Sequence, residues 1–184
     1  MTRFNACSSA ALALVASLAF TGCGGTVDFS IDEMLTVDSN VNAGTAMVSV
    51  DLAAEAGKAW KQRDKIDSVT VDQGEATVAT VNAGNVATTV GGSIWLLPDG
   101  ATQTTDSGTV LVGSWTGEPV TQGHFIALTP SPALDAFVKN AFSGSGKFSM
   151  LATGAGAGGA RLAVTLHVVL GAKLKWKLFE APGG

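Results

Sequence analysis

The chain has 184 residues, a length that allows one domain of ordinary size. Its formal net charge of −4 excludes the strongly basic surface of a nucleic-acid-binding domain, so no nucleic acid is expected as a partner. Hydrophobic residues make up 46% of the chain and charged residues only 14%, and 23 residues are glycine, a mixture that favours strands and turns over long exposed helices.

The first 22 residues have the layout of a secretory signal. Arg3 supplies a positive start, and residues 10–20 form an apolar run that is shorter than the roughly 20 residues of a membrane span. We therefore expect residues 1–22 to be removed on export. Cys7 would leave with them, so Cys23 would be the only cysteine of the mature chain and would have no disulfide partner.

Residues 18–23 read Leu-Ala-Phe-Thr-Gly-Cys. This segment resembles the lipobox of bacterial lipoproteins, in which small residues precede an invariant cysteine, although Phe20 stands where that family usually has Leu. The resemblance implies that the Cys23 thiol carries a diacylglyceryl group, that the signal is cut just before it, and that the new amino group is acylated, as by palmitate. The alternative is an incidental cysteine beside an ordinary secretory cleavage site.

The residue after Cys23 is Gly24. In the lipoproteins that this segment resembles, an Asp at this position is a signal for retention in the inner membrane, and this chain lacks it. The resemblance therefore implies an outer-membrane location in the cell envelope, with the membrane itself as a partner through the lipid. The expected organisation is a lipidated tether over residues 23–26 and one domain over residues 27–181, held close to the bilayer.

The domain begins with strand-like sequence over residues 26–31 and 45–51. In the second stretch Ala46, Val48 and Val50 alternate with residues of the other face, the pattern of a half-buried strand.

Residues 52–65 are compatible with a short amphipathic helix or with a charged loop. Residues 66–71 and 75–81 predict a hairpin with residues 72–74 as its connection. Further strands are expected at residues 93–97, 109–115 and 122–128, the first of which ends at the turn Pro98-Asp99-Gly100.

One helix is predicted over about residues 131–143. Ser131 suits the N-cap, Pro132 suits the first helical position, and Gly144 suits the stop. Apolar residues follow at helical spacing on one face: Leu134, Phe137, Val138, Ala141 and Phe142.

Strand patterns return at residues 147–153 and 161–170, on either side of a glycine-rich stretch, residues 154–159, that we expect to be a flexible hairpin loop. Residues 173–178 alternate lysines with apolar residues, as an exposed edge strand would. The fold class is therefore expected to be mostly β, an antiparallel β-sandwich or barrel-like fold of about eight strands with one short helix.

No catalytic, metal-binding or cofactor-binding residue is predicted. Residues 154–159 match G-x-G-x-x-G, but strand-like sequence follows where dinucleotide binding needs a helix start. His124 and His167 stand alone, without Cys or His at metal-ligand spacing, and we expect His167 to face outward or to be satisfied by a partner. A nucleophile elbow of the form Gly-x-Ser-x-Gly is also missing from the sequence.

The acidic residues Asp28, Asp32 and Glu33 lack the spacing of a calcium loop, and we expect them to be solvated. Residues 23–130 hold 13 acids and four bases, whereas residues 131–184 hold two acids and six bases. Oppositely charged solvated faces are the simplest reading of this asymmetry.

Trp60 is the one candidate contact residue. It lies beside Lys58, Lys61 and Arg63, so it could be an exposed contact or an anchor at the lipid interface. Packing in the core is the alternative.

The chain resembles the β-sandwiches of the late-embryogenesis-abundant type 2 (water stress and hypersensitive response) family. The resemblance is carried by the alternation of strands and turns over residues 66–128, the helix at residues 131–142 and the closing strands over residues 147–178. Some members of that family occur in bacterial lipoproteins. We expect a membrane-anchored, non-catalytic module that binds an envelope protein, an envelope polymer or an apolar ligand. A structural or assembly lipoprotein is the alternative, and an extracytoplasmic hydrolase is a third possibility.

Overall fold

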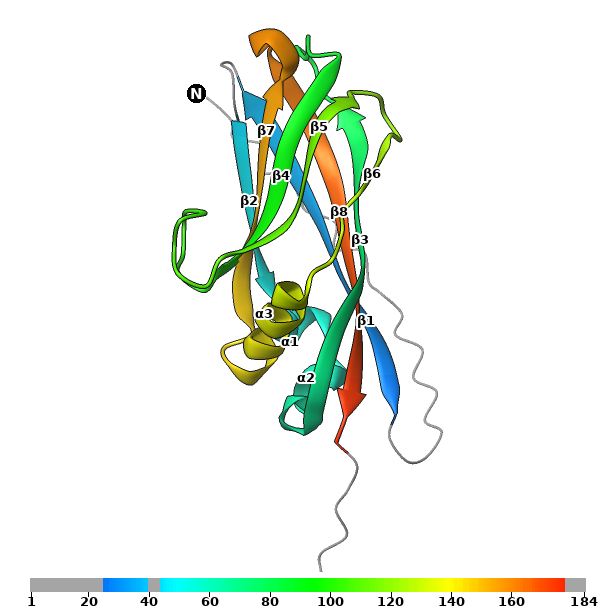
Figure 1. The fold of residues 1–184 in the computed structure, drawn as a ribbon, viewed down its shortest axis with the longest axis vertical. Helices are drawn as coiled ribbons and strands as arrows, with labels where there is room; N and C mark the ends of the chain where they lie inside the picture. Colours follow the sequence, from blue (N-terminus) through cyan, green and yellow to red (C-terminus); the bar gives the residue numbers. More distant parts are fainter. Residues whose placement is uncertain (1–24, 40–43, 178–184) are drawn as a thin grey trace, which may run out of the picture.

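The computed structural model describes residues 25–39 and 44–177. They contain eight strands: β1 (Thr26–Ser39), β2 (Gly44–Asp51), β3 (Ile66–Val81), β4 (Thr89–Pro98), β5 (Val110–Pro119), β6 (Phe125–Ala127), β7 (Lys147–Gly156) and β8 (Leu162–Trp176). One antiparallel sheet has the order β1-β8-β3-β6 and the other the order β2-β7-β4-β5 (Figure 1). The two sheets pack face to face, which confirms the predicted β-sandwich.

The helical segments are α1 (Leu52–Glu55), α2 (Lys58–Lys61), α3 (Pro132–Ser143) and the 3-10 turns η1 (Arg63–Lys65) and η2 (Ala157–Gly159). Residues 52–65, for which helix and loop were both open, thus form α1, α2 and η1. The prediction for α3 is confirmed at both ends, since it begins at Pro132 and stops before Gly144. No helix among the described residues has the length and apolar content needed to cross a bilayer.

Strand alternation places the core between the two sheets. On β1, Phe29, Ile31, Leu35 and Val37 are buried, while the residues between them face outward or are only half-buried. On β8 every second residue from Leu162 is buried in the same way. Side chains from both sheets and from α3 join in one hydrophobic cluster, so the described residues share a single core.

The predicted hairpin over residues 66–81 is wrong, because β3 runs without interruption and pairs with β8 along its length. The register shifts between Val71 and Gln73, so Asp72 stands outside the ladder and pairs through its carboxylate with Lys173. The Asp-Gln-Gly sequence therefore forms a bulge and not a turn. Gly74 suits this position, because a Cβ would lie 3.0 Å from the Leu128 carbonyl oxygen and would crowd it.

The carboxy-terminal strand patterns also merge into one strand, β8, because Gly171 stays paired with Ser30 of β1 and with Gln73 of β3. The lysines at 173 and 175 were expected to mark an edge, but β8 lies between β1 and β3. The glycine-rich stretch is more ordered than a flexible loop, since β7 continues to Gly156 and η2 follows. Of residues 122–128, only Phe125–Ala127 pair as a strand.

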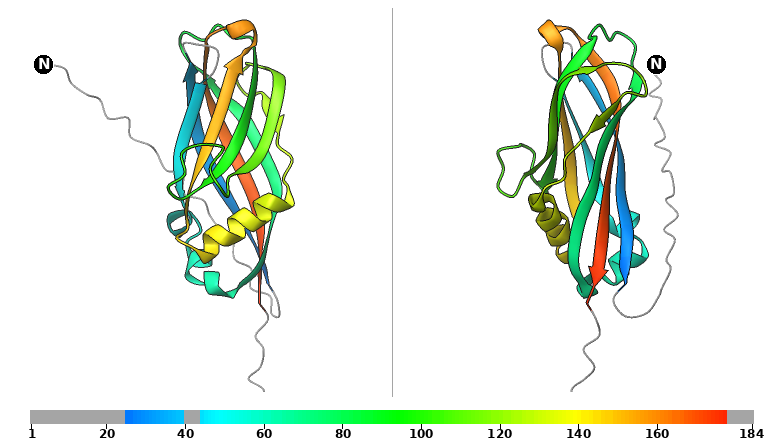
Figure 2. Two further views of the ribbon diagram at one scale, coloured as in Figure 1. Left: turned by 60° about the vertical axis from the view of Figure 1, so that its left-hand side comes forward. Right: turned by 45° about the vertical axis from the view of Figure 1, so that its right-hand side comes forward.

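α3 lies across the lower part of the open side of the sandwich, next to β3 and β5 (Figures 1 and 2). Four of its apolar residues, Leu134, Phe137, Val138 and Phe142, are buried against the sheets. The Asp135 carboxylate accepts a hydrogen bond from the backbone N–H of Val71 at 2.7 Å, and this bond fixes the first turn of α3 to β3. The adjoining side of α3, with Ala133, Ala136 and Asn140, lines a surface cleft.

Candidate functional site

A surface cleft runs between β5, the segment 127–129 and α3. Its upper part, about 550 Å³, lies between residues 109–114 and residues 127–133. Its lower part, about 590 Å³, lies between α3 and the base of the β4–β5 loop. Val110 and Ala133 line both parts, so they form one continuous feature, which we call the β5–α3 cleft.

The lower part of the cleft has an apolar floor. Val110, Phe137 and Phe148 line it, and the two phenyl rings meet edge to face with centroids 5.4 Å apart and planes at 87°. Ala133 and Ala136 line the cleft from α3, and the two phenylalanines below them are themselves buried. A floor of this composition suits an apolar side chain or ligand.

The rim of the lower part is polar. Ser145 donates a hydrogen bond to the Asp99 carboxylate at 3.2 Å, and its hydroxyl accepts one from the backbone N–H of Lys147, also at 3.2 Å. Asn140 lines the same rim. Fixed polar groups around an apolar floor are typical of sites that orient a bound molecule.

The upper part of the cleft exposes a strand edge. β5 pairs with β4 on one side, and its other side makes no backbone hydrogen bond within residues 25–39 and 44–177. Leu128 closes the gap to the core behind this edge, since it lies against Gly113 of β5 and Gly74 of β3. Unpaired N–H and C=O groups at such an edge can pair with an added strand.

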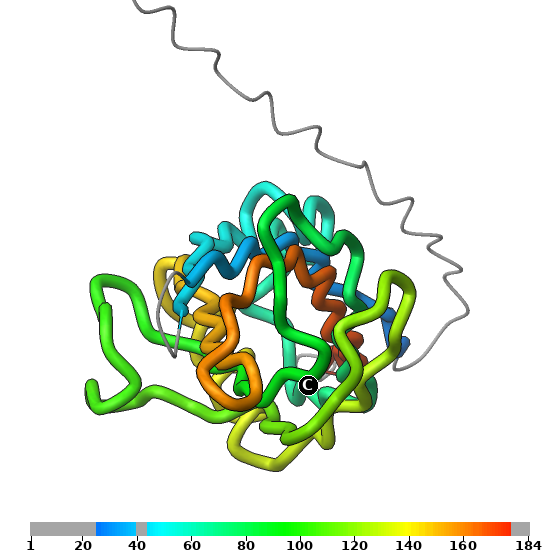
Figure 3. Tube along the Cα trace, turned by 90° about the horizontal axis from the view of Figure 1, so that it is seen from above, coloured from blue at the N-terminus to red at the C-terminus, as the bar shows by residue number. Residues whose placement is uncertain are grey.

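The β4–β5 loop, residues 99–109, reaches furthest from the body of the sandwich when the molecule is viewed along its long axis (Figure 3). The Asp106 carboxylate accepts hydrogen bonds from the N–H groups of Thr102 (2.9 Å) and Gln103 (3.0 Å), and these bonds lower the pKa of Asp106. The carboxylate thus organises the loop internally. Asp99 and Gly108 at its base form one wall of the lower cleft.

Of the two residues singled out from the sequence, Cys23 lies outside the described residues, which begin at Gly25. Trp60 is half-buried at the end of the sandwich, with its ring centroid 6.2 Å from that of Phe142 and its six-membered ring over Gly146. The Arg63 guanidinium lies 4.3 Å from the Trp60 ring centroid. Trp60 therefore combines core packing on one side with a charged neighbour on the other, and it does not line the β5–α3 cleft.

Both histidines have carboxylate partners that sequence spacing missed. His124 Nε2 lies 2.7 Å from a Glu118 oxygen, and His167 Nε2 lies 2.5 Å from an Asp32 oxygen. The second pair joins neighbouring strands, β8 and β1, which only the sheet order brings together. The expectation that His167 is satisfied by a partner is confirmed, and in the described part of the chain neither histidine bonds to a serine.

The acidic residues of β1 divide between the two faces of the strand. Asp28 and Asp32 face outward and are exposed as expected, whereas Glu33 occupies an inward-facing position and is half-buried. Burial raises the pKa of Glu33, and the carboxyl of Glu55 on α1 is its hydrogen-bond partner. Within residues 25–39 and 44–177, no three His, Cys, Asp or Glu side chains gather to hold a metal ion.

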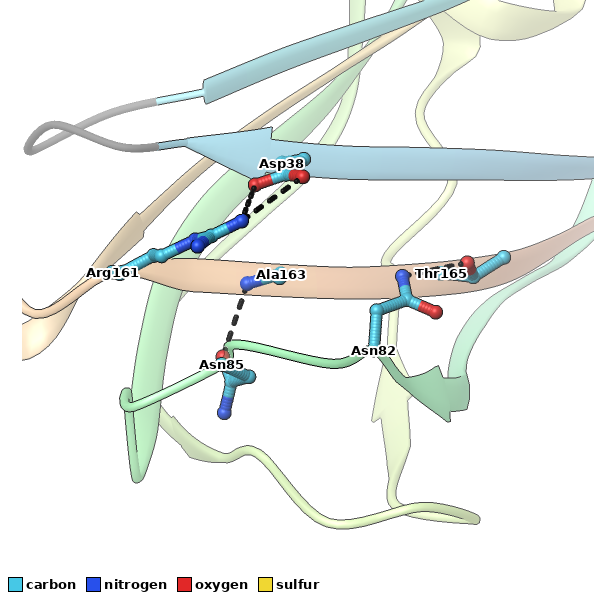
Figure 4. A network of polar contacts seen from close by, with 6 residues as sticks. All are labelled: Asp38, Asn82, Asn85, Arg161, Ala163 and Thr165. Carbon is cyan, nitrogen blue, oxygen red and sulfur yellow. Dashed lines mark hydrogen bonds and ion pairs between the residues drawn. The ribbon is translucent and has the colours of Figure 1, made fainter.

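A polar network closes the end of the sandwich at which β8 begins (Figure 4). Arg161 pairs with Asp38 at 3.2 Å, Asn85 accepts a hydrogen bond from the Ala163 N–H at 3.0 Å, and Asn82 donates one to Thr165 at 3.2 Å. These bonds fasten the β3–β4 connection to β8. The network is structural and is separate from the β5–α3 cleft.

Comparison with known proteins identifies no family. No family model matches the chain, and no curated protein matches it. Among solved structures, Desmodium yellow mottle tymovirus is similar at 11% identity and a TM-score of 0.35, over 92% of this chain and 97% of that one. An empty head of turnip yellow mosaic virus (11% identity, TM-score 0.35, 96% and 94% covered) and mud crab tombus-like virus (11%, 0.31, 99% and 95%) are similar too. These likenesses are too distant to carry an argument about function.

Proposed function

We propose that this chain is an exported lipoprotein, anchored in the outer membrane by acyl groups on Cys23, whose β-sandwich binds an extended segment of another envelope protein in the β5–α3 cleft. The anchor is supported by the lipobox-like sequence that ends at Cys23, two residues before the described domain begins. The binding role is supported above all by the unpaired edge of β5 beside an apolar cleft with a polar rim.

An extended peptide uses both parts of the cleft at once. Its backbone would pair with the free edge of β5, which gives affinity without regard to sequence. Because side chains of a strand alternate, one of them would point toward the floor formed by Phe137 and Phe148, which favours an apolar residue at that position. A small apolar ligand would fill only the lower part and leave the edge of β5 unused.

The anchor is tested by mass analysis of the mature amino terminus. We expect an amino-terminal Cys23 that carries a diacylglyceryl group and an amide-linked acyl chain, and membrane association that persists in high salt. Cys23→Ala should abolish both, because two or more acyl chains are what make anchoring stable. An unmodified Cys23 in the wild-type chain would refute the anchor.

The cleft is tested by a photo-crosslinking amino acid at Ala136 in cells that make the full chain. We expect one dominant protein adduct from this position, and a strong reduction when Ala133→Trp is added to fill the cleft. The matched control is the crosslinker at Lys139, which is exposed on the same helix but does not line the cleft.

Equal adducts from the two positions would show that the cleft does not select a partner. A co-purified lipid that Ala133→Trp displaces, detected by native mass spectrometry in place of a protein adduct, would assign the cleft to an apolar ligand.

A further inference from the structure

One end of the sandwich joins three segments that are far apart in the sequence. The backbone N–H of Trp176 donates to the Gly25 carbonyl at 3.3 Å, and that of Lys177 donates to the Lys65 carbonyl at 2.8 Å. The start of β1, the end of β8 and the α2–η1 segment therefore lie side by side at the lower end of the molecule (Figures 1 and 2). We call this surface the basic end and define it as residues 25–27, 56–67 and 174–177.

Six exposed cationic residues stand on the basic end, against two acidic ones, Asp64 and Asp67. The six are Lys58, Lys61, Arg63, Lys65, Lys175 and Lys177. The other described residues hold 12 acids and only four bases. The positive charge of a net acidic chain is thus concentrated at one end of its long axis, which favours an anionic partner there.

Several of these cations have no counter-ion. Within residues 25–39 and 44–177, no carboxylate lies within salt-bridge distance of Lys58, Lys61 or Lys175. By contrast, Arg161 and Lys173, outside the basic end, pair with Asp38 and Asp72. The charges of Lys58, Lys61 and Lys175 are therefore available to act on another molecule.

The basic end is also the part of the described chain nearest to Cys23. Only Gly24 lies between Cys23 and Gly25, and an extended chain covers at most about 7 Å over these two residue steps. Gly25 is hydrogen-bonded to Trp176, so a membrane that holds Cys23 would lie near Lys175 and Lys177, which flank Trp176. The electrostatic screening length at physiological salt, about 8 Å, is comparable with this reach. Two half-buried tryptophans, Trp60 and Trp176, belong to the same surface and suit a lipid interface.

We infer that the basic end is a docking surface for the anionic head groups of a phospholipid bilayer. Its orientation toward the membrane rests on the proposed anchor at Cys23, whereas its affinity for anionic lipid does not. Contact at this end would stand the sandwich upright, since the acidic remainder of the molecule is repelled by the same surface.

The test uses the mature chain from residue 23 with Cys23→Ala, which retains all described residues and carries no acyl group. Co-sedimentation at low ionic strength is measured with vesicles of phosphatidylcholine alone and of equal parts phosphatidylcholine and phosphatidylglycerol. We expect binding to the anionic vesicles only, with loss as salt is raised. Lys58→Glu, Lys61→Glu and Lys175→Glu should each weaken binding by about fivefold or more, and the triple variant should not bind.

Lys139→Glu is the matched control, because it makes the same charge change outside the basic end and should leave binding nearly unchanged. Thermal unfolding of each variant checks that it is folded. Equal binding to both vesicle types, or equal loss in Lys139→Glu and Lys61→Glu, would overturn the inference. An unacylated Cys23 in the wild-type chain would refute the anchor and leave this result standing, so the two proposals fail separately.

Discussion

Glu33 occupies an inward-facing position on β1, between the buried residues Ile31 and Leu35. β1 is an edge strand, and an inward-pointing carboxyl on such a strand discourages pairing with a second chain. Placing a carboxyl at this position affects the neighbouring carboxyl of Glu55 on α1. Partial burial and the nearby charge of Glu33 raise the pKa of Glu55 from 4.5 to about 7.

This carboxyl pair gives stability a pH dependence. Because the pKa of Glu55 is higher in the folded chain than in the unfolded chain, the folded state binds the proton more tightly. The free energy of unfolding should therefore fall as pH rises from about 4.5 to about 7. Glu33→Gln should reduce this fall by about 1 kcal/mol, a modest value because Glu55 is partly exposed and solvent screens its charge.

The measurement is urea unfolding of wild type and Glu33→Gln at several pH values across this interval. The two curves should converge at low pH, where both glutamates of the wild-type chain are protonated. A difference between the variants that is the same at every pH would rule out the coupled pair as its cause.

Among the elements, α3 is connected to the rest of the core through Phe142. This side chain is 1% exposed, and its ring lies 5.6 Å from that of Phe29 on β1 and 6.2 Å from that of Trp60 on α2. It thus joins three elements that have no backbone pairing with one another.

Phe142→Ala should lower the free energy of unfolding by about 3–5 kcal/mol, because a buried ring is replaced by a cavity. Phe125→Ala is the matched control: Phe125 is 52% exposed on β6, and its loss should cost less than about 1 kcal/mol. Both free energies of unfolding are to be measured by denaturant unfolding. Similar losses for the two variants would mean that α3 is not held by this contact.

The elements that sequence analysis predicted well are those determined by local residues. Ser131, Pro132 and Gly144 set the ends of α3 without help from distant parts of the chain. The Asp-Gln-Gly of β3 and Gly171 of β8 were misjudged because these residues favour turns locally. Pairing across the sheet, with Lys173 and with Gln73, holds them in strands instead.

The candidate site also divides into features determined by local residues and features determined by the fold. Cys23 could be proposed from six consecutive residues, because lipid attachment depends on a local motif. The β5–α3 cleft could not, since it exists only because the strand order leaves β5 at an edge and places Leu128 and α3 beside it. The carboxylate partner of His167 was hidden for the same reason, as Asp32 lies on another strand.

At the scale of the whole molecule, the cations gather at one end of the long axis, and this grouping does not match the division of charge between the two halves of the sequence. Residues 58–65 belong to the acidic half of the chain, yet folding places them beside the lysines that end β8. The fold thus gathers six cations from both halves of the sequence at one end of the molecule.

The pairing of β1 with β8 also determines how the molecule would carry mechanical load. A pull from a bound partner, resisted by an anchor at Cys23, would enter the fold at the start of β1 and act along the strand. The 14 residue pairs that join β1 to β8 would then be sheared together and not opened one at a time. Hydrogen bonds perpendicular to the force share the load among themselves, so β1 would carry tension between the membrane and the partner without separating from β8 one pair at a time.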